Sequence, residues 1–406
     1  GRIGAGACKP GPGIVSVHAV WHLRAPLRAM PSQSLLGKLL RKRRAGNSNS
    51  PERTPSKQIR TNAKTLTFVL DGKARADGMP VACGLPGQVV EDTEVAGNGN
   101  EQKLEVPTLL EDEGMHIRWE KVLAGRHASK LSSEELRELG EGGMPLKHRH
   151  ALWPEWFTAP NINDIEQLQG NVPNDVAAQI EADVARTQPK FLGTAERATL
   201  RRVLRAYAAA NPSVGYCQGM NNIVAVFILL GFDEATALRG CYTMIQGCCP
   251  GYHDRDLAGF RLDALVLGEL AQRVLPAEIY DRLQALDVPI EVLISEHFLT
   301  LASRSWPLHA TARLWDIILQ EGSPAVFASF LALLKLYLPD DKDFHQENNL
   351  ANGYEASEPV DIFRSRVSLG VSNDLEAILR EVRRLIPLIP QNTINQLRFE
   401  FAGKKH

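Results

Sequence analysis

The feature that most constrains the fold is a dense helical pattern of apolar residues that runs from residue 115 to residue 338. In the segment 195–210, apolar side chains recur at the spacing of one helical face, at Leu200, Val203, Leu204 and Tyr207. Similar segments, separated by Gly, Pro or Asp, follow at 219–230, 233–246, 260–274, 277–286, 290–303, 309–320 and 324–338. No alternating strand-like run interrupts them, and no fixed repeat indicates a solenoid. The pattern predicts an all-α fold.

The composition is that of an ordinary globular chain. Its 406 residues suffice for a substantial core, and hydrophobic and charged residues make up 44% and 23% of them. These values exclude a chain that is disordered throughout, a collagen-like fibre and a disulfide-bonded miniprotein. The formal net charge of -1 gives no electrostatic reason to expect nucleic acid as a partner.

No motif indicates a metal, nucleotide or membrane-spanning site. The six cysteines form no C-x-x-C pair, which argues against a zinc site or a disulfide framework and fits a reducing cytosol. Phosphate-loop, dinucleotide-binding and H-E-x-x-H motifs are also missing from the sequence. We therefore expect no cofactor of its own. The longest apolar runs are shorter than the ~20 residues of a spanning helix, so we expect no segment to cross a membrane.

The chain divides into four regions. Residues 1–114 are a low-complexity tail that we expect to be disordered, and residues 115–340 form the helical domain. Residues 341–360 are predicted to be an acidic linker or loop, and residues 361–406 a C-terminal helical segment that packs on the domain. The first residue is Gly, which suggests a fragment, a processed form or a translation begun upstream of a start such as Met30.

Charge is segregated within the tail. Residues 1–51 contain nine Lys or Arg and no acid, whereas residues 91–113 contain eight acids and one Lys. A short leucine stripe precedes a cationic cluster in the segment 35–44. Such a segment could make weak contact with an anionic membrane, and the alternatives are a solvated basic tail, a nuclear import signal or an organelle transit segment.

A first motif opens the helical domain at residues 143–153. Pro145 suits the first turn of a helix, and Arg149 and Trp153 follow at steps of four, so they share one helical face. Both are interpreted mainly as residues that stabilise the fold.

Two further motifs contain the polar residues of greatest interest. In residues 180–187, Asp183 and Arg186 are three apart on a helix with a buried stripe, close enough to pair. Residues 216–221 form a turn that leads into an apolar helix. The Gly-x-Cys-x-Gly pattern around Cys217 superficially matches a nucleophile elbow, but an elbow requires a strand before the nucleophile, and the preceding segment is helical. A cysteine hydrolase that uses Asp263 with His297 or His309 is therefore a remote alternative.

The three motifs, in this order, resemble the TBC domain of GTPase-activating proteins for Rab GTPases. The family signature I-x-x-D-x-x-R-T is complete at residues 180–187 and Y-C-Q-G-M is complete at residues 216–220. A later R-x-W-D segment is matched at residues 313–316, and Gln188 departs from the aromatic residue or His that is usual there. The resemblance implies a multi-helix TBC-type fold and a role in vesicle trafficking and intracellular protein transport at endomembranes.

The resemblance also implies a mechanism in which Arg186 and Gln218 act as fingers inserted into a Rab GTPase in its GTP form. The protein would then be an activator acting in trans rather than a stand-alone enzyme, and GTP and Mg²⁺ would belong to the partner. Arginine can donate two parallel hydrogen bonds to phosphate oxygens, and glutamine can orient the attacking water.

Supporting roles are expected for a further set of residues, which comprises Asp183, Thr187, Tyr216, Gly219 and Arg149. Without the motifs, Arg186 would be interpreted as a helix C-terminal cation paired with Asp183, and Gln218 as a polar residue at a helix start. The main rival function is a catalytically inactive TBC scaffold that binds a Rab or an adaptor.

Overall fold

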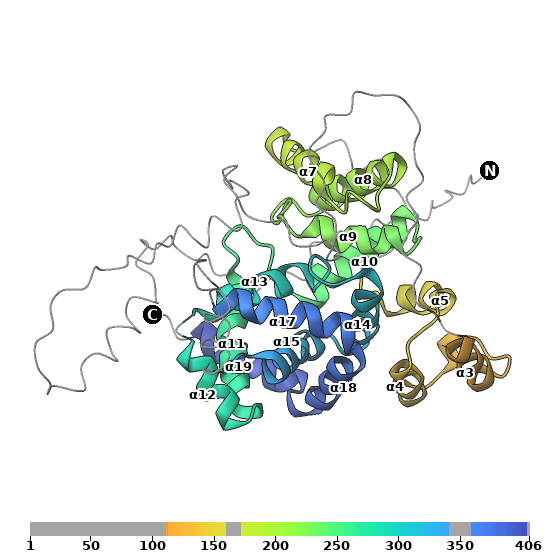
Figure 1. Ribbon diagram of the computed structural model, residues 1–406. Coiled ribbons are helices and arrows are strands. Elements are labelled where there is room, and N and C mark those ends of the chain that lie inside the picture. The colour runs from red at the N-terminus through yellow and green to blue at the C-terminus, as the bar shows by residue number, and fades with distance from the viewer. Residues whose placement is uncertain (1–110, 112, 160–171, 287, 341–358, 404–406) are drawn as a thin grey trace, which may run out of the picture. The chain divides into compact units, whose positions relative to one another are not determined.

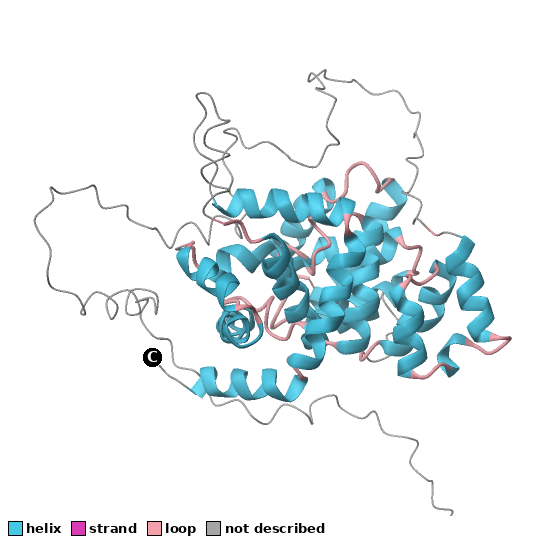
Figure 2. Cartoon of the chain, turned by 60° about the horizontal axis from the view of Figure 1, so that its bottom comes forward, coloured by secondary structure: helices cyan, strands magenta, loops and turns pink. Residues whose placement is uncertain are grey.

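The computed structural model describes residues 111, 113–159, 172–286, 288–340 and 359–403. Within these ranges the regular elements are helices joined by loops, and no strand occurs (Figure 2). The predicted all-α fold is thus confirmed. The expected tail up to residue 110 and nearly all of the expected acidic linker lie outside the described residues.

Among the residues that the structure describes, three α-helices and a short 3₁₀ segment precede the motifs at residues 180–187 and 216–220. They are α3 (Glu113–Leu123), η1 (Ala128–Lys130), α4 (Ser133–Glu141) and α5 (Leu146–Trp156). A capping box begins α4, because the Ser132 hydroxyl accepts from the Glu135 amide while the Glu135 carboxylate accepts from the Ser132 amide. Buried apolar side chains of α3 and α4, with Met144 from the loop after α4 and Leu152 from α5, form a separate small cluster.

These two motifs lie among the next four described helices, which pack on one another (Figure 1). These are α7 (Asn174–Arg186), α8 (Thr194–Ala210), α9 (Met220–Leu229) and α10 (Glu234–Tyr242), followed by the π-helical segment η3 (Thr243–Cys248). Asn211 and Pro212 end α8, and the Asp233 carboxylate caps α10 by accepting from the Thr236 amide. Because α9 is apolar on nearly all sides, it is buried among its neighbours.

The second half of the domain continues with five helices: α11 (Ala258–Val274), α12 (Ala277–Ala285), α13 (Ile290–Thr300), α14 (Leu308–Glu321) and α15 (Ser323–Tyr337). Proline immediately precedes α12, α13 and α14, where its fixed φ favours the helix start. Nearly the whole of α15 is buried, as its apolar sequence predicts.

The C-terminal segment contains more helix than the sequence pattern predicted. One amphipathic helix was expected, whereas α17 (Pro359–Asn373), α18 (Leu375–Leu385), η4 (Ile386–Leu388) and α19 (Gln391–Gly403) are present. Helix α18 packs on α15 and α19 packs on α11. The apolar period of α19 is blurred because Phe399 is 81% exposed, which explains why periodicity alone did not reveal that helix.

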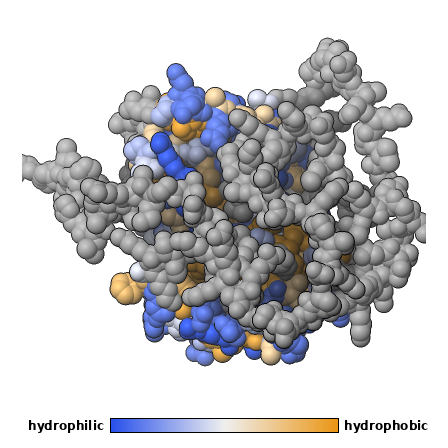
Figure 3. Space-filling view, turned by 90° about the vertical axis from the view of Figure 1, so that its left-hand side faces the viewer, coloured by the Kyte–Doolittle hydropathy of each residue, from blue (hydrophilic) through white to orange (hydrophobic). Residues whose placement is uncertain are grey.

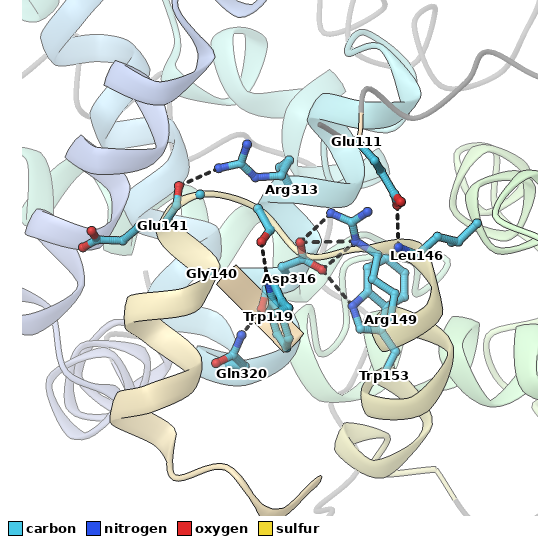
Figure 4. Close-up of polar contacts among 12 residues, drawn as sticks. Glu111, Trp119, Gly140, Glu141, Leu146, Arg149, Trp153, Arg313, Asp316 and Gln320 are labelled. Atoms are coloured by element: carbon cyan, nitrogen blue, oxygen red, sulfur yellow. Dashed lines mark hydrogen bonds and ion pairs between the residues drawn. The ribbon is translucent and has the colours of Figure 1, made fainter. Parts of the chain in front are cut away.

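The carbonyl groups at the end of α4 accept hydrogen bonds from side chains of three other helices. Figure 4 shows two of these donors, Trp119 of α3 and Arg313 of α14. The last carbonyls of a helix have no partner within it, and cationic side chains there also suit the helix dipole. The four hydrogen bonds run from Arg383 Nη2 to Gly140 O (2.8 Å), Arg313 Nη2 to Glu141 O (2.9 Å), Arg118 Nη2 to Gly142 O (3.1 Å) and Trp119 Nε1 to Gly143 O (2.8 Å). These bonds tie α3, α14 and α18 to one helix end.

The described surface is mixed in hydropathy. In Figure 3, hydrophilic residues lie along the upper and lower edges of the visible described surface, with hydrophobic residues among them. The most exposed large apolar side chains are those of Phe399 and Leu369. Among the described helices, none combines the length and the apolar character needed to span a bilayer.

Candidate functional site

Arg186 is the last residue of α7, and a buried carboxylate holds its guanidinium from one side. The buried residues Ile180 and Val184 anchor the inner face of the helix. Arg186 Nε and Nη2 donate to Asp183 Oδ1 at 2.9 and 2.5 Å. The side chain of Asp183 is 3% exposed and that of Arg186 is 54% exposed. The pair thus combines a fixed inner anchor with an accessible cation.

The backbone turns sharply directly after Arg186. The Thr187 hydroxyl donates to the carbonyl of Asp183 at 2.6 Å, which closes the last turn of α7. Gln188 then has a φ of 41°, in the left-handed region that residues with a side chain rarely adopt. The motif therefore ends in a tight, hydrogen-bonded bend.

The second motif forms the turn before α9, and its shape requires glycine. Gly219 has a φ of 114°, and a Cβ atom there would lie 2.9 Å from the carbonyl oxygen of Leu299. Both the conformation and the close approach to α13 exclude a larger residue without rearrangement. Gln218, the preceding residue, is half-buried on the same turn.

Tyr216 connects the two motifs. Its hydroxyl donates to Asp183 Oδ2 at 2.6 Å, on the opposite carboxylate oxygen from that used by Arg186. Burial raises the pKa of Tyr216 well above its ordinary value, and the negative charge of Asp183 adds to this shift. Tyr216 therefore stays a neutral donor, and Asp183 accepts from both motifs at once.

Asn221 makes a second connection, and no role was predicted for it. Its Nδ2 donates to Thr187 Oγ1 at 2.8 Å, and its Oδ1 accepts from the Gly219 amide at 3.0 Å. Oδ1 also lies 3.3 Å from the Tyr216 hydroxyl. The sequence places Asn221 directly after the Y-C-Q-G-M signature, which is the only signal that could have drawn attention to it.

Arg149 belongs to a different set of contacts, formed between α5 and α14 (Figure 4). Arg149 Nη2 and Nε donate to the two oxygens of Asp316 at 2.7 and 3.0 Å, and Trp153 Nε1 donates to the same carboxylate at 2.9 Å. All three residues are buried. The structure brings together Arg186, Asp183, Thr187, Tyr216 and Gly219 through α7 and α9, whereas Arg149 serves helix packing elsewhere.

The surroundings of Cys217 do not favour a nucleophile. Burial raises the pKa of Cys217 to about 11, and the negative charge of Asp183 contributes to the shift. Asp263 is paired with Arg398 at 2.6 Å and accepts from Tyr252, while His297 contacts the Ser329 hydroxyl at 2.8 Å. Burial lowers the pKa of His297 to about 3. These contacts engage Asp263 and His297 with partners other than Cys217.

In the part of the chain that the structure describes, no three His, Cys, Asp or Glu side chains are grouped so as to hold a metal ion. The absence of a cofactor of its own stays a prediction.

Comparison with known proteins identifies relatives of this architecture. A family model described as the Rab-GTPase-TBC domain matches residues 151–340, which extend from α5 to the end of α15. Growth hormone-regulated TBC protein 6 of Caenorhabditis elegans is 33% identical over 221 residues, which cover 54% of this chain and 64% of the relative. Human growth hormone-regulated TBC protein 1 is 31% identical over 231 residues, which cover 54% and 68%.

Other matches cover less of the relative or are more distant. The TBC domain-containing protein C4G8.04 of Schizosaccharomyces pombe is 33% identical over 222 residues, 52% of this chain but 28% of that protein. The chain thus spans less than two thirds of the length of some of these relatives. The TBC domain of a Chlamydomonas flagellar RabGAP is similar at 24% identity and a TM-score of 0.48, over 66% of this chain and 92% of that one.

Proposed function

Because this chain belongs to the Rab-GTPase-TBC domain family, we propose that it activates GTP hydrolysis by a Rab-family small GTPase. The activator acts in trans on the GTP form of its partner and is not a stand-alone enzyme. GTP and Mg²⁺ are held by the GTPase, and the activator supplies side chains only.

Arg186 is proposed as the arginine finger. A small GTPase hydrolyses GTP slowly because charge that develops on the phosphate oxygens in the transition state is poorly neutralised. A guanidinium stays charged and can donate two parallel hydrogen bonds to those oxygens. The exposed side of Arg186 suits this task, since the buried Asp183 carboxylate already orients its other edge.

Gln218 is proposed as the glutamine finger. Its amide can accept a hydrogen bond from the attacking water and donate one to phosphate, so it can orient the nucleophile without taking a proton. In this mechanism it replaces the glutamine of the GTPase's own switch region. Asp183, Tyr216, Thr187 and Gly219 support the two fingers by fixing the segments that carry them.

One observation carries the proposal. The 2.6 Å hydrogen bond from the Tyr216 hydroxyl to Asp183 joins the turn that contains Gln218 to the carboxylate that holds Arg186. Two fingers can act on one phosphate group only if they rise from neighbouring points, and this bond supports that arrangement.

The test is single-turnover phosphate release from a panel of purified Rab GTPases, with wild type, Gln218→Ala and Cys217→Ser compared side by side. We expect Gln218→Ala to lose most of the stimulation and Cys217→Ser to keep it. A Rab whose switch glutamine is changed to Leu should still be stimulated by wild type. The reverse ranking of the two variants would refute the finger assignment.

The same assay separates the activator from an inactive scaffold. A scaffold would bind some GTP-loaded Rab, yet no Rab would hydrolyse GTP faster and neither substitution would change the rate. Arg186 and Gln218 are both present, and a module that only binds would not need this pair, so the activator is the favoured function.

We further propose that the protein is cytoplasmic and associates peripherally with endomembranes in vesicle trafficking. The acid-free segment 35–44, which lies outside the described residues, would give weak contact with anionic lipid, at about 1 kcal/mol per basic residue near the surface. Full chain and a variant with Arg41, Lys42, Arg43 and Arg44 changed to Gln can be compared for binding to phosphatidylserine vesicles at low salt. Equal binding by both would remove this part of the proposal.

A further inference from the structure

The side chain of Asn221 lies buried at the junction of the two finger motifs. It is 5% exposed and sits in the first turn of α9. Its amide uses both ends: Nδ2 donates to Thr187 Oγ1, and Oδ1 accepts from the Gly219 amide. The Gly219 amide can only donate, so it fixes which end of the Asn221 side chain is the oxygen.

The contacts of Asn221 with Gly219 and Thr187 are each one residue away from a finger. The Gly219 amide belongs to the same peptide unit as the carbonyl of Gln218, so Oδ1 fixes the plane of that peptide. Thr187 directly follows Arg186. Asn221 is therefore bonded to the backbone of one finger segment and to the residue next to the other finger.

The hydrogen bonds around Thr187 run in one direction. Asn221 Nδ2 donates to the Thr187 hydroxyl, and that hydroxyl donates to the carbonyl of Asp183 at 2.6 Å. The hydroxyl hydrogen is committed to Asp183, so Thr187 Oγ1 can only accept from Asn221, and position 221 must supply a donor. Position 221 must also supply an acceptor for Gly219, and an amide side chain satisfies both requirements.

We propose that Asn221 is a positioning residue that sets the distance and orientation between Arg186 and Gln218. The inference rests on the proposed function, because two fingers must reach one transition state simultaneously. A displacement of about 1 Å away from the chemistry can lower a rate by roughly 100-fold. Asn221 does not touch the substrate, so its effect is exerted through the two segments that it joins.

The first experiment compares Asn221→Ala with Asn222→Ala, which changes the next residue of the same helical turn. In single-turnover assays with a responsive Rab, Asn221→Ala should lower the maximal stimulated rate roughly 10- to 100-fold. The activator concentration for half-maximal stimulation should change less than about threefold, because most of the binding surface is retained. Asn222→Ala should match wild type in both quantities.

Two further readouts distinguish positioning from a general loss of structure. In a Gln218→Ala background, Asn221→Ala should lower the stimulated rate by a much smaller factor than it does in wild type, because the finger that it positions is already gone. Hydrogen exchange should become faster at the Gly219 amide while amides of α11 keep their protection. A variant that merely unfolds would lose rate equally in both backgrounds and protection everywhere.

Thr187 provides a second route if Asn221→Ala folds poorly. Thr187→Ser keeps the hydroxyl and should keep most of the stimulated rate, whereas the near-isosteric Thr187→Val should lose it to a similar extent as Asn221→Ala. If wild type stimulates a Rab but Asn221→Ala equals Asn222→Ala, the inference is overturned and the proposed function stands. If wild type stimulates no Rab, the proposed function fails and takes the inference with it.

Discussion

Two arginine–aspartate pairs in this molecule use the same chemistry in different surroundings. In the pair formed by Arg149 and Asp316, the side chains are 3% and 4% exposed. In the pair formed by Arg186 and Asp183, the carboxylate is equally buried at 3%, but the arginine is 54% exposed. The two pairs therefore differ almost entirely in how exposed the arginine side chain is.

This difference distinguishes an arginine that holds two helices together from one that is exposed to a binding partner. A cation that is buried with its carboxylate, as Arg149 is, makes its charge available only to the interior, where it fixes α5 against α14. A cation that rests on a buried carboxylate at a helix end is oriented without being enclosed. Sequence motifs mark both arginines, and burial tells which of them is suited to meet a partner.

The largest expected effect tests the exposed pair. Arg186→Lys should lose most of a stimulation on the order of 10³- to 10⁵-fold, because an ammonium lacks the planar fork that can contact two phosphate oxygens. Lys is preferred to Ala because it keeps a cation beside the buried Asp183. Phosphate release from a responsive Rab is the measurement.

The matched control for this variant is Arg201→Lys. Arg201 is 38% exposed and pairs with Glu181 at 2.7 Å, so it tests loss of an arginine fork on the neighbouring helix. We expect its rate to stay near that of wild type. Near-full activity of Arg186→Lys would contradict the distinction drawn between the two pairs.

The buried pair should respond in stability rather than in rate. Arg149→Met leaves the Asp316 carboxylate buried without its cation and should lower the free energy of unfolding by about 3 to 5 kcal/mol. Urea denaturation is the measurement, and the double variant Arg149→Met, Asp316→Leu should recover part of the loss. Unchanged stability together with lost stimulation would indicate that Arg149 takes part directly in GTP hydrolysis.

Buried histidines offer a contrast in which burial removes the charge. Burial lowers the pKa of His253 to about 4 and that of His297 to about 3. Below pH ~6.5 the unfolded chain binds protons that the folded chain does not, so stability falls as pH falls from there toward these values. Each of these histidines should lower the free energy of unfolding by about 2 kcal/mol when the pH falls from 7 to 5.

The pH effect can be isolated by comparing slopes. The loss of unfolding free energy between pH 7 and pH 5 should be smaller in His297→Asn than in wild type, whatever its absolute stability. Equal slopes for the two proteins would show that His297 does not stay neutral in the fold.

The smallest effect is expected for an ion pair in which neither partner is buried. Arg201 and Glu181 are 38% and 42% exposed, and water screens their attraction. Arg201→Ala should change the free energy of unfolding by less than about 1 kcal/mol, as measured by urea denaturation. A loss as large as that of Arg149→Met would mean that burial does not explain the ranking.

Much of the fold could be predicted because the central helices alternate cleanly between buried and exposed faces. Leu200, Val203, Leu204 and Tyr207 are all buried, as their spacing indicated. Helix starts could also be predicted from the sequence, because Pro276, Pro289 and Pro307 each precede a helix. The boundaries of α17 and α19 could not be predicted, because exposed apolar residues such as Leu369 and Phe399 obscure the helical period of their sequences.

The site was predictable only in part. Motif spacing predicted Arg186 and Gln218 as fingers, and it correctly suggested that Asp183 pairs with Arg186. It could not reveal that Asp183 also accepts from Tyr216 or that Asn221 reaches Thr187. These contacts join residues 33 and 34 positions apart, and only the packing of α7 against α9 brings them together.

The end of α4 carries a consequence for how such a chain can change over evolution. Its carbonyls are bonded by Arg118 from α3 and by Arg383 from α18, two helices on opposite sides of the segment that the family model matches. A chain shortened in evolution by the loss of α18 would lose the Arg383 bond but keep the backbone bond from the Gly143 amide to the Gly140 carbonyl. The two flanking regions are therefore expected to be only weakly coupled through this helix end.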